Sequence, residues 1–148
     1  MATAIQNSVE RWLVHESLRF RYAKSDTDTF RAVITSPGGP DDGTEVFEPK
    51  NQPGVIVIGR KCPLNAGQNA RFLAMTEQEQ SRVRNRIAEY CDSIGAVHRF
   101  LEENGLNMVG VYTVIDAAER QNQSDFSESL GGTARMAGRL KDHLRRTV

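Results

Sequence analysis

The chain has 148 residues, close to the commonest size of a single domain, and a chain of this length buries about two-thirds of its unfolded surface on folding. Its 19 Lys and Arg residues balance 19 Asp and Glu residues. This balance argues against a general binder of nucleic acid or membrane surfaces, because such proteins rely on a positive field. The hydrophobic fraction of 39% and the charged fraction of 26% are typical of a globular protein, so we expect one domain over residues 1–148.

The first half predicts a helix followed by strands. Residues 3–17 have a helical apolar face, with Thr3 as a possible N-cap and Trp12 as a docking anchor. Alternating apolar residues then predict strands at 18–23 and 30–35, a short third strand at Val46 and Phe47, and a fourth at 55–58. The fourth is apolar on both faces and is therefore expected at the centre of the sheet, ending at residues 59–63. Residues 36–43, SPGGPDDG, are expected to form an exposed hairpin connection.

The second half predicts a long amphipathic helix. Residues 64–75 show no clear period. Thr76 and Glu79 have the spacing of a capping box, which would begin a helix. An apolar stripe continues from there to Leu101, so one helix is expected. Asn104-Gly105 would end this helix. The stripe is formed by Val83, Ile87, Tyr90, Cys91, Ile94, Val97 and Leu101.

The remaining residues predict one strand and one helix. Residues 106–117 read as a two-faced strand in which Gly110 marks a bulge or a close backbone approach. Residues 119–125 read as a polar linker, and residues 124–146 as a helix. A break at Gly131-Gly132, with Thr133 capping a second piece, is the alternative. The fold class is therefore α+β, with N-terminal, long central and C-terminal helices packed on one face of a mainly antiparallel sheet.

Few residues point to catalysis or to a metal. His15, His98 and His143 are scattered over three predicted helices, without other ligands at metal spacing. Cys62 follows Arg60 and Lys61, and cations of this kind lower a thiol pKa, but a small apolar filler is the more common role of such a cysteine. The aspartates at 26, 28, 41 and 42 fit turn chemistry better than a calcium loop. We therefore expect no catalytic residues, no metal and no cofactor.

The last predicted helix carries a local basic patch on an otherwise neutral chain. A solvated helix face, with cations near the C-terminal end of the helix dipole, is the simpler explanation of this patch. Binding of an acidic partner or of nucleic acid is the alternative. The residues concerned are Arg135, Arg139, Lys141, Arg145 and Arg146.

The cysteines and the hydropathy pattern indicate a cytoplasmic protein. Cys62 and Cys91 have no CxxC partners, so an unlinked pair in a reducing compartment is expected. The N-terminal residues lack a basic region followed by an apolar run, as a secretory signal would have, and no window approaches the roughly 20 apolar residues of a membrane span.

The order of elements resembles the type III secretion chaperone-like superfamily. The segments that carry the likeness are the N-terminal helix with Val9, Trp12 and Leu13, then FRYAKSDTDTFRAVITSP, EVFEPKN and GVIVIGRKCPL, then the long helix, LNMVGVYTVID and the last helix. Secretion chaperones are acidic and often have two strands after the long helix, whereas this chain is neutral and one strand is expected after its long helix. The likeness is therefore to a stand-alone member. It implies a small α+β homodimer that binds segments of partner proteins and has no catalytic residues.

Three functions follow from these observations. The first is a protein-binding, chaperone-like module that forms a homodimer through a sheet face or the long helix. The second is nucleic-acid or acidic-partner binding through the basic last helix, with affinity that falls as salt rises. The third is a small enzyme with Cys62 or a histidine in a pocket.

Overall fold

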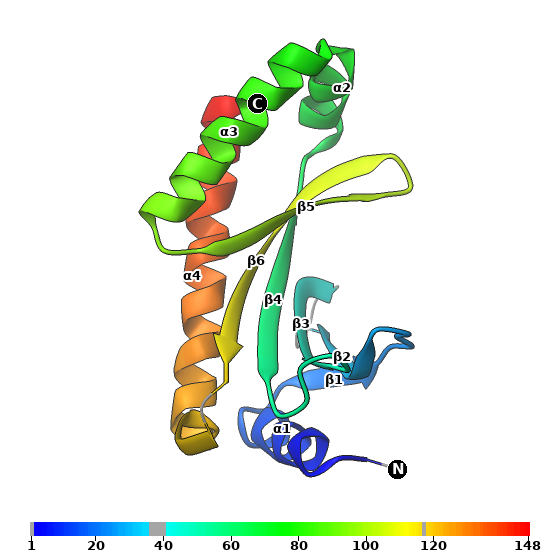
Figure 1. Ribbon diagram of the computed structural model, residues 1–148, viewed down its shortest axis with the longest axis vertical. Coiled ribbons are helices and arrows are strands. Elements are labelled where there is room, and N and C mark those ends of the chain that lie inside the picture. The colour runs from blue at the N-terminus through cyan, green and yellow to red at the C-terminus, as the bar shows by residue number, and fades with distance from the viewer. Residues whose placement is uncertain (1, 36–40, 117) are drawn as a thin grey trace. The chain divides into compact units, whose positions relative to one another are not determined.

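The computed structural model describes residues 2–35, 41–116 and 118–148, and its elements are shown in Figure 1. In this part of the chain, four α-helices and one short 3₁₀ helix accompany a six-stranded antiparallel sheet with the strand order β1-β2-β3-β4-β6-β5. The α+β class predicted from the sequence is therefore correct. None of the helices found there is both long and apolar enough to cross a membrane.

The N-terminal half follows the predicted order. Helix α1 spans Ala4–His15, and the Thr3 side chain accepts a hydrogen bond from the Gln6 amide, as the cap prediction requires. Three antiparallel pairings join the first four strands. Their bounds are β1 (Arg19–Tyr22), β2 (Asp28–Thr35), β3 (Asp41–Pro49) and β4 (Ile56–Pro63).

Three strands in this half are longer than predicted, and the first of them, β2, begins at Asp28 rather than at Phe30. Strand β3 begins at Asp41, so part of the expected loop is strand, while residues 36–40 of that loop lie outside the described residues. Strand β4 continues to Pro63 rather than ending at Gly59. The ladder explains part of the extension, because Gly59 and Arg60 pair with Glu45 and Thr44. The predicted central position of β4 is confirmed, since it lies between β3 and β6.

A helix that the sequence analysis missed follows β4. Helix α2 spans Ala66–Ala74. Its N-terminus is a capping box in which Asn65 and Gln68 satisfy each other's backbone amides, and this spacing is the signal that could have predicted it. The helix is only nine residues long and buries just Gln68 and Phe72, which is too little to produce a visible period.

The single long helix predicted over residues 76–105 is wrong. Helix α3 spans Glu77–Ser93 and has the predicted capping box of Thr76 and Glu79. Gly95 ends it in the left-handed region with φ +69°. The amide of Ala96 donates to the Cys91 carbonyl and that of Gly95 to the Asp92 carbonyl, which is the Schellman pattern.

A hairpin replaces the second part of the predicted helix. Strand β5 spans Val97–Glu103 and β6 spans Leu106–Ile115. Asn104 and Gly105 connect them with φ +53° and φ +80°, the two positive angles of a type I′ turn. Two strands therefore follow α3, where one was expected.

The last helix is continuous. A 3₁₀ turn at Ala118–Arg120 overlaps the start of the expected polar linker, and α4 then runs from Gln123 to Thr147. Thr133 does not cap a second piece, because its hydroxyl donates to the Ser129 carbonyl one turn earlier and also contacts the Thr113 hydroxyl at 2.7 Å. The alternative of a break at Gly131-Gly132 is therefore wrong.

The chain forms two compact units, each built from two segments. Unit 1 comprises residues 1–60 and 112–134, and unit 2 comprises residues 61–111 and 135–148. The core of unit 1 joins α1 to the sheet, with Trp12 against Phe126 at 5.2 Å between ring centroids. The core of unit 2 contains both cysteines, three leucines and the buried face of α3. Strands β4 and β6 and helix α4 each have residues in both units.

Candidate functional site

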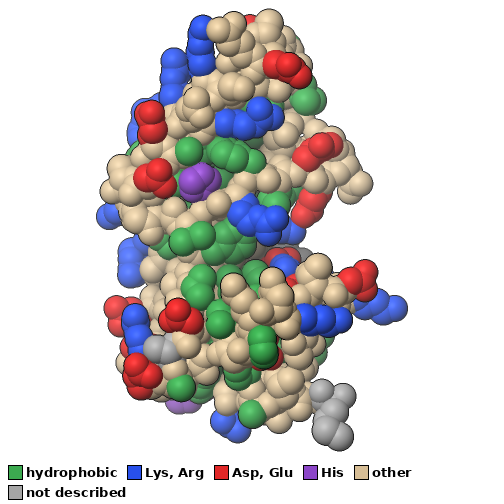
Figure 2. All heavy atoms as spheres, viewed as in Figure 1, with side chains coloured by type: hydrophobic (Ala, Val, Ile, Leu, Met, Phe, Trp, Pro, Cys, Tyr) green, Lys and Arg blue, Asp and Glu red, His purple; other side chains and the backbone are tan. Residues whose placement is uncertain are grey.

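An open apolar groove of about 210 Å³ lies within unit 2. Helices α2 and α3 supply part of its lining, and the β5–β6 hairpin supplies another part. Figure 2 shows hydrophobic side chains gathered at the molecular surface around β5. The lining residues are Leu64, Phe72, Val83, Arg84, Ile87, Phe100, Leu101, Glu102, Asn107, Met108, Val109 and Val148.

The floor of the groove is part of the unit 2 core. Val83 and Ile87 stand one turn apart on α3 and are buried, as the apolar stripe of this helix predicts. Val109 from β6 belongs to the same core. The floor is therefore fixed by packing and does not depend on the occupant of the groove.

The rim of the groove carries exposed apolar surface and a few polar groups. The Phe100 side chain is 40% exposed although it is aromatic. The Arg84 guanidinium lies over the Phe72 ring at 5.3 Å from its centroid, a cation–π contact that holds the cation beside the groove. Glu102 contributes the negative charge of the lining and Asn107 an amide. The site thus combines an apolar surface with both signs of charge.

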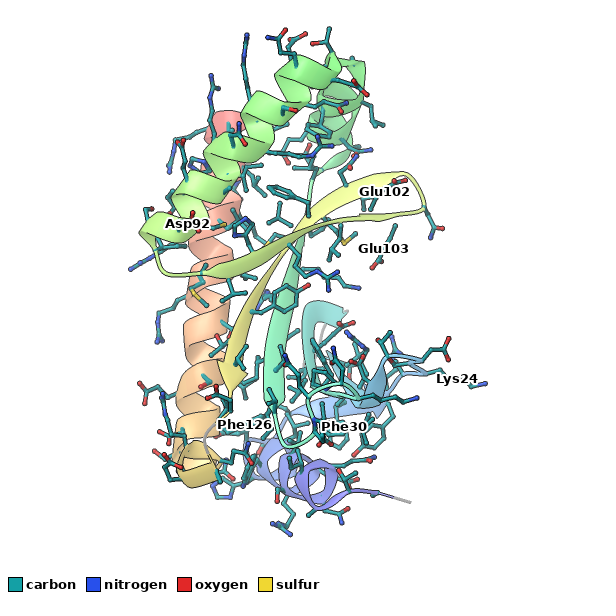
Figure 3. The ribbon with its side chains drawn as sticks, in the orientation of Figure 1. Lys24, Phe30, Asp92, Glu102, Glu103 and Phe126 are labelled. Carbon is teal, nitrogen blue, oxygen red and sulfur yellow. The ribbon has the colours of Figure 1, made fainter. Side chains whose placement is uncertain are left out.

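Hydrogen bonds and an ion pair hold the hairpin. Asn69 on α2 donates from its side chain to the Gly105 carbonyl and accepts from the Asn107 amide, both at 3.0 Å. Lys61 Nζ lies 2.6 Å from Glu103 Oε1. Figure 3 shows Glu102 and Glu103 at the turn end of β5, on opposite sides of the strand. These contacts fix the position of the hairpin relative to α2 and β4 within unit 2.

The five basic residues predicted on the last helix all lie on the part of α4 that belongs to unit 2. Four are exposed and Lys141 is half-buried. Arg145 pairs with Asp142 at 3.4 Å, and it stands one turn before Val148 of the groove lining. The exposed residues are Arg135, Arg139, Arg145 and Arg146.

The division into units reveals a charge asymmetry that the whole-chain balance hides. Unit 2 contains 11 Lys and Arg residues against 7 Asp and Glu residues, a formal charge of +4. Unit 1 contains 8 against 12, a formal charge of −4. The zero net charge is therefore the sum of two opposite local charges, and the groove lies in the positive unit.

The structure does not gather the three histidines into one site. His15 is exposed on α1 in unit 1, whereas His98 lies on β5 beside Phe100 and His143 lies on α4 stacked on Tyr90. No group of three or more metal-ligating side chains occurs among the residues that the structure describes.

Both cysteines are buried in the core of unit 2 and are not in a disulfide. The Cys62 thiol is fully buried and donates to the Ala137 carbonyl at 3.8 Å. Burial raises the pKa of Cys91 to about 11, with smaller contributions from Asp92 and Cys62. Of the two interpretations of Cys62, the buried position favours the apolar filler, because a nucleophile needs access and an accessible thiolate.

The buried carboxylates of unit 1 are held by other groups in the fold. Asp28, which the sequence places in a turn, lies at the start of β2 and pairs with Arg31 at 2.9 Å. Arg31 also pairs with Glu45 and lies over the Phe47 ring. Glu48 accepts from the Gly54 amide at 2.9 Å and from the Thr3 hydroxyl. These carboxylates therefore connect strands and loops of unit 1.

The groove could not be predicted while Phe100, Leu101 and Glu102 of its lining were assigned to a helix. Two signals could have found it. Gly95 stands at the C′ position of α3, and Asn-Gly between two runs containing apolar residues is the strongest short signal of a hairpin.

The fold and the groove define a small α+β protein with a six-stranded sheet and an open apolar surface beside its last hairpin. The chain belongs to a family described as an uncharacterized conserved protein, DUF2299, whose model matches residues 5–128. A comparison with curated proteins finds no match. Among solved structures, the chain is similar to an uncharacterized protein from Methanothermobacter thermautotrophicus, with 16% identity, a TM-score of 0.73 and coverage of 97% of this chain and 99% of that one. This similarity shows the fold alone.

Proposed function

We propose that the protein is a non-enzymatic, chaperone-like module that binds a segment of a partner protein in the groove of unit 2. The observation that carries the proposal is the groove itself, which exposes Phe100 beside a floor of core residues. An apolar side chain of a partner gains free energy when it leaves water for such a surface. The order of elements, with two strands after α3, also supports the resemblance to the chaperone-like superfamily.

Charge complementarity indicates the chemistry of the partner segment. Arg84 lies in the groove lining, Arg145 lies one turn from Val148, and unit 2 carries an excess of positive charge. A segment with apolar anchors and acidic residues between them would match this surface better than a basic one. We therefore propose an acidic amphipathic segment as the occupant, and the cytoplasm as the compartment, since both cysteines are unlinked.

The test uses fluorescence anisotropy with two labelled peptides. Both carry leucines at i, i+3, i+4 and i+7, and the positions between are glutamates in one peptide and lysines in the other. We expect the acidic peptide to bind more tightly. A double variant, Arg84→Glu with Val148→Glu, is expected to weaken this binding about tenfold or more, equivalent to about 1.4 kcal/mol.

The control for the location of the added negative charge is Lys24→Glu, which changes an exposed residue of unit 1, labelled in Figure 3. This variant should bind the acidic peptide as the wild type does. Equal binding of the two peptides, or equal losses in both variants, would contradict the proposal. A labelled DNA oligonucleotide that binds more tightly than the acidic peptide at low salt would instead favour the nucleic-acid alternative.

A further inference from the structure

Strand β5 forms one edge of the sheet. In the strand order β1-β2-β3-β4-β6-β5 it has β6 as its neighbour on one side. Its side chains are exposed or half-buried throughout, including two large apolar ones, with Val97 at 58% and Phe100 at 40% exposure. An edge strand of seven residues with exposed apolar side chains is a template for pairing with another strand.

The charges of β5 are separated along the strand. Arg99 is the cation of its first half, where it follows His98. Glu102 and Glu103 stand in its second half, and Phe100-Leu101 lie between the two ends. Charged residues also protect sheet edges from association, and a strand with one sign of charge would repel a copy of itself. Two signs at opposite ends have the contrary effect in an antiparallel pair, because the end of each strand that carries Arg99 then lies beside the end of the other that carries Glu102 and Glu103.

We infer that β5 pairs antiparallel with β5 of a second copy of this chain, about a two-fold axis at Phe100. A two-fold axis perpendicular to a sheet places each residue opposite a residue of the other copy that points to the same face. Phe100 therefore lies opposite Phe100 of the second copy, and His98 lies opposite its Glu102. The alternative axis at Leu101 would place Arg99 opposite Glu103. Because Glu103 is already paired with Lys61, the axis at Phe100 keeps that ion pair intact.

This pairing has a consequence for the groove. Phe100 and Glu102 both line it, and the two-fold axis keeps the same face of the sheet on the same side in both copies. The dimer would therefore present two grooves on one face of a continuous sheet. Dimerisation does not require that the groove binds a peptide, so the two proposals can fail separately.

The direct test is disulfide formation between two copies. Phe100→Cys places a thiol on the axis, where directly opposite Cα atoms lie about 4.5–5.5 Å apart, within the range that a disulfide spans. Val97→Cys is the matched control on the same strand. In the dimer, the two residues at position 97 would be separated by about six residues, or roughly 20 Å, along the strand direction. Cys62 and Cys91 are buried, so the introduced thiol is the accessible one.

We expect a covalent dimer of Phe100→Cys under mild oxidation and little of it for Val97→Cys. Equal rates for the two variants, or no cross-link at position 100, would overturn the pairing. Sedimentation of the wild type supplies a second criterion, because a monomer at the highest soluble concentration would also overturn it.

Charge-swapped variants test the same pairing without cysteines. One variant, His98→Glu with Arg99→Glu, has an acidic strand throughout, and the other, Glu102→Arg with Glu103→Arg, has a basic one. Each is expected to remain monomeric alone, and an equimolar mixture is expected to form a heterodimer that weakens as salt rises. Heterodimer formation would itself show that both variants fold. Homodimers of either variant as stable as the wild type would place the interface elsewhere.

Discussion

The stacked pair of Tyr90 and His143 shows how single residues join the helices of unit 2. The two rings lie 4.1 Å apart between centroids and are nearly parallel, and His143 Nε2 lies 3.0 Å from the Thr147 hydroxyl. Burial, and then Arg146, lower the pKa of His143, and a hydrogen bond with the Arg86 backbone partly offsets the shift. The neutral ring is therefore the form that the junction of α3 and α4 favours.

The first prediction concerns acid stability. Because the pKa of His143 is lowered on folding, protonation favours the unfolded chain. The free energy of unfolding should fall as the pH decreases through 6.5, the unfolded value, toward the lower folded value. His143→Phe, which can still stack on Tyr90, should reduce this decline in urea titrations at several pH values. His15→Gln removes an exposed histidine of α1 as the control. A decline in His143→Phe as steep as in the wild type would contradict the prediction.

The second prediction concerns alkaline stability and Cys91. Its pKa of about 11 lies above the ordinary 9.0, so the folded state retains the thiol proton longer than the unfolded chain does. The stabilisation is complete below pH 9 and is lost as the pH rises toward 11. Denaturant unfolding of the wild type and of Cys91→Ala over this range measures the effect. The difference between them should shrink as the pH rises, and a constant difference would show that the thiol does not titrate in this way.

At the scale of elements, two glycines decide where α3 ends and where the hairpin turns. Gly95 and Gly105 both have positive φ, and the sequence analysis interpreted the second of them as the end of a helix. Periodicity could not separate these possibilities, because Val97 and Leu101 continue the spacing of the α3 stripe. In the structure Val97 is instead an exposed residue of β5. The apolar pattern alone was therefore consistent with two structures, and the backbone conformation at Gly95 selected one.

The third prediction compares two glycine substitutions. Gly105→Ala introduces a side chain at φ +80° and should destabilise the fold by about 1 kcal/mol, because residues with a Cβ atom disfavour this region. Gly138→Ala lies within α4 with no atom within 4 Å of the added Cβ, and should stabilise the fold by about 0.5–1 kcal/mol. Thermal and urea unfolding of both variants measures whether the free energy of unfolding falls or rises in each. The same sign for both would show that backbone conformation is not the cause.

At the scale of the whole molecule, three elements connect the two units. Strands β4 and β6 and helix α4 each contribute residues to both cores. Phe126 of α4 is fully buried in the core of unit 1, and Leu140 of the same helix is fully buried in the core of unit 2. Unfolding of either unit therefore removes the support of part of a shared helix.

The fourth prediction is that the units unfold together. Phe126→Ala and Leu140→Ala should each lower the free energy of unfolding, by about 3–5 and about 2–5 kcal/mol, within one cooperative transition. Far-ultraviolet circular dichroism reports both units, whereas the fluorescence of Trp12 reports unit 1. Coincident transitions by the two probes are expected in both variants. A Leu140→Ala transition that leaves the Trp12 signal unchanged would show that unit 1 unfolds independently.

The sequence by itself determined the α+β class, the helix caps at Thr3 and Thr76, the central position of β4 and the approximate extent of α4. These features rest on local chemistry and periodicity, which are readable along the chain. The tertiary structure alone decided that residues 97–103 form an edge strand, that Cys62 and Cys91 share one core, and that opposite charges separate into two units. The groove was also decided by the tertiary structure. It is made of residues far apart in the chain, and only folding brings them together.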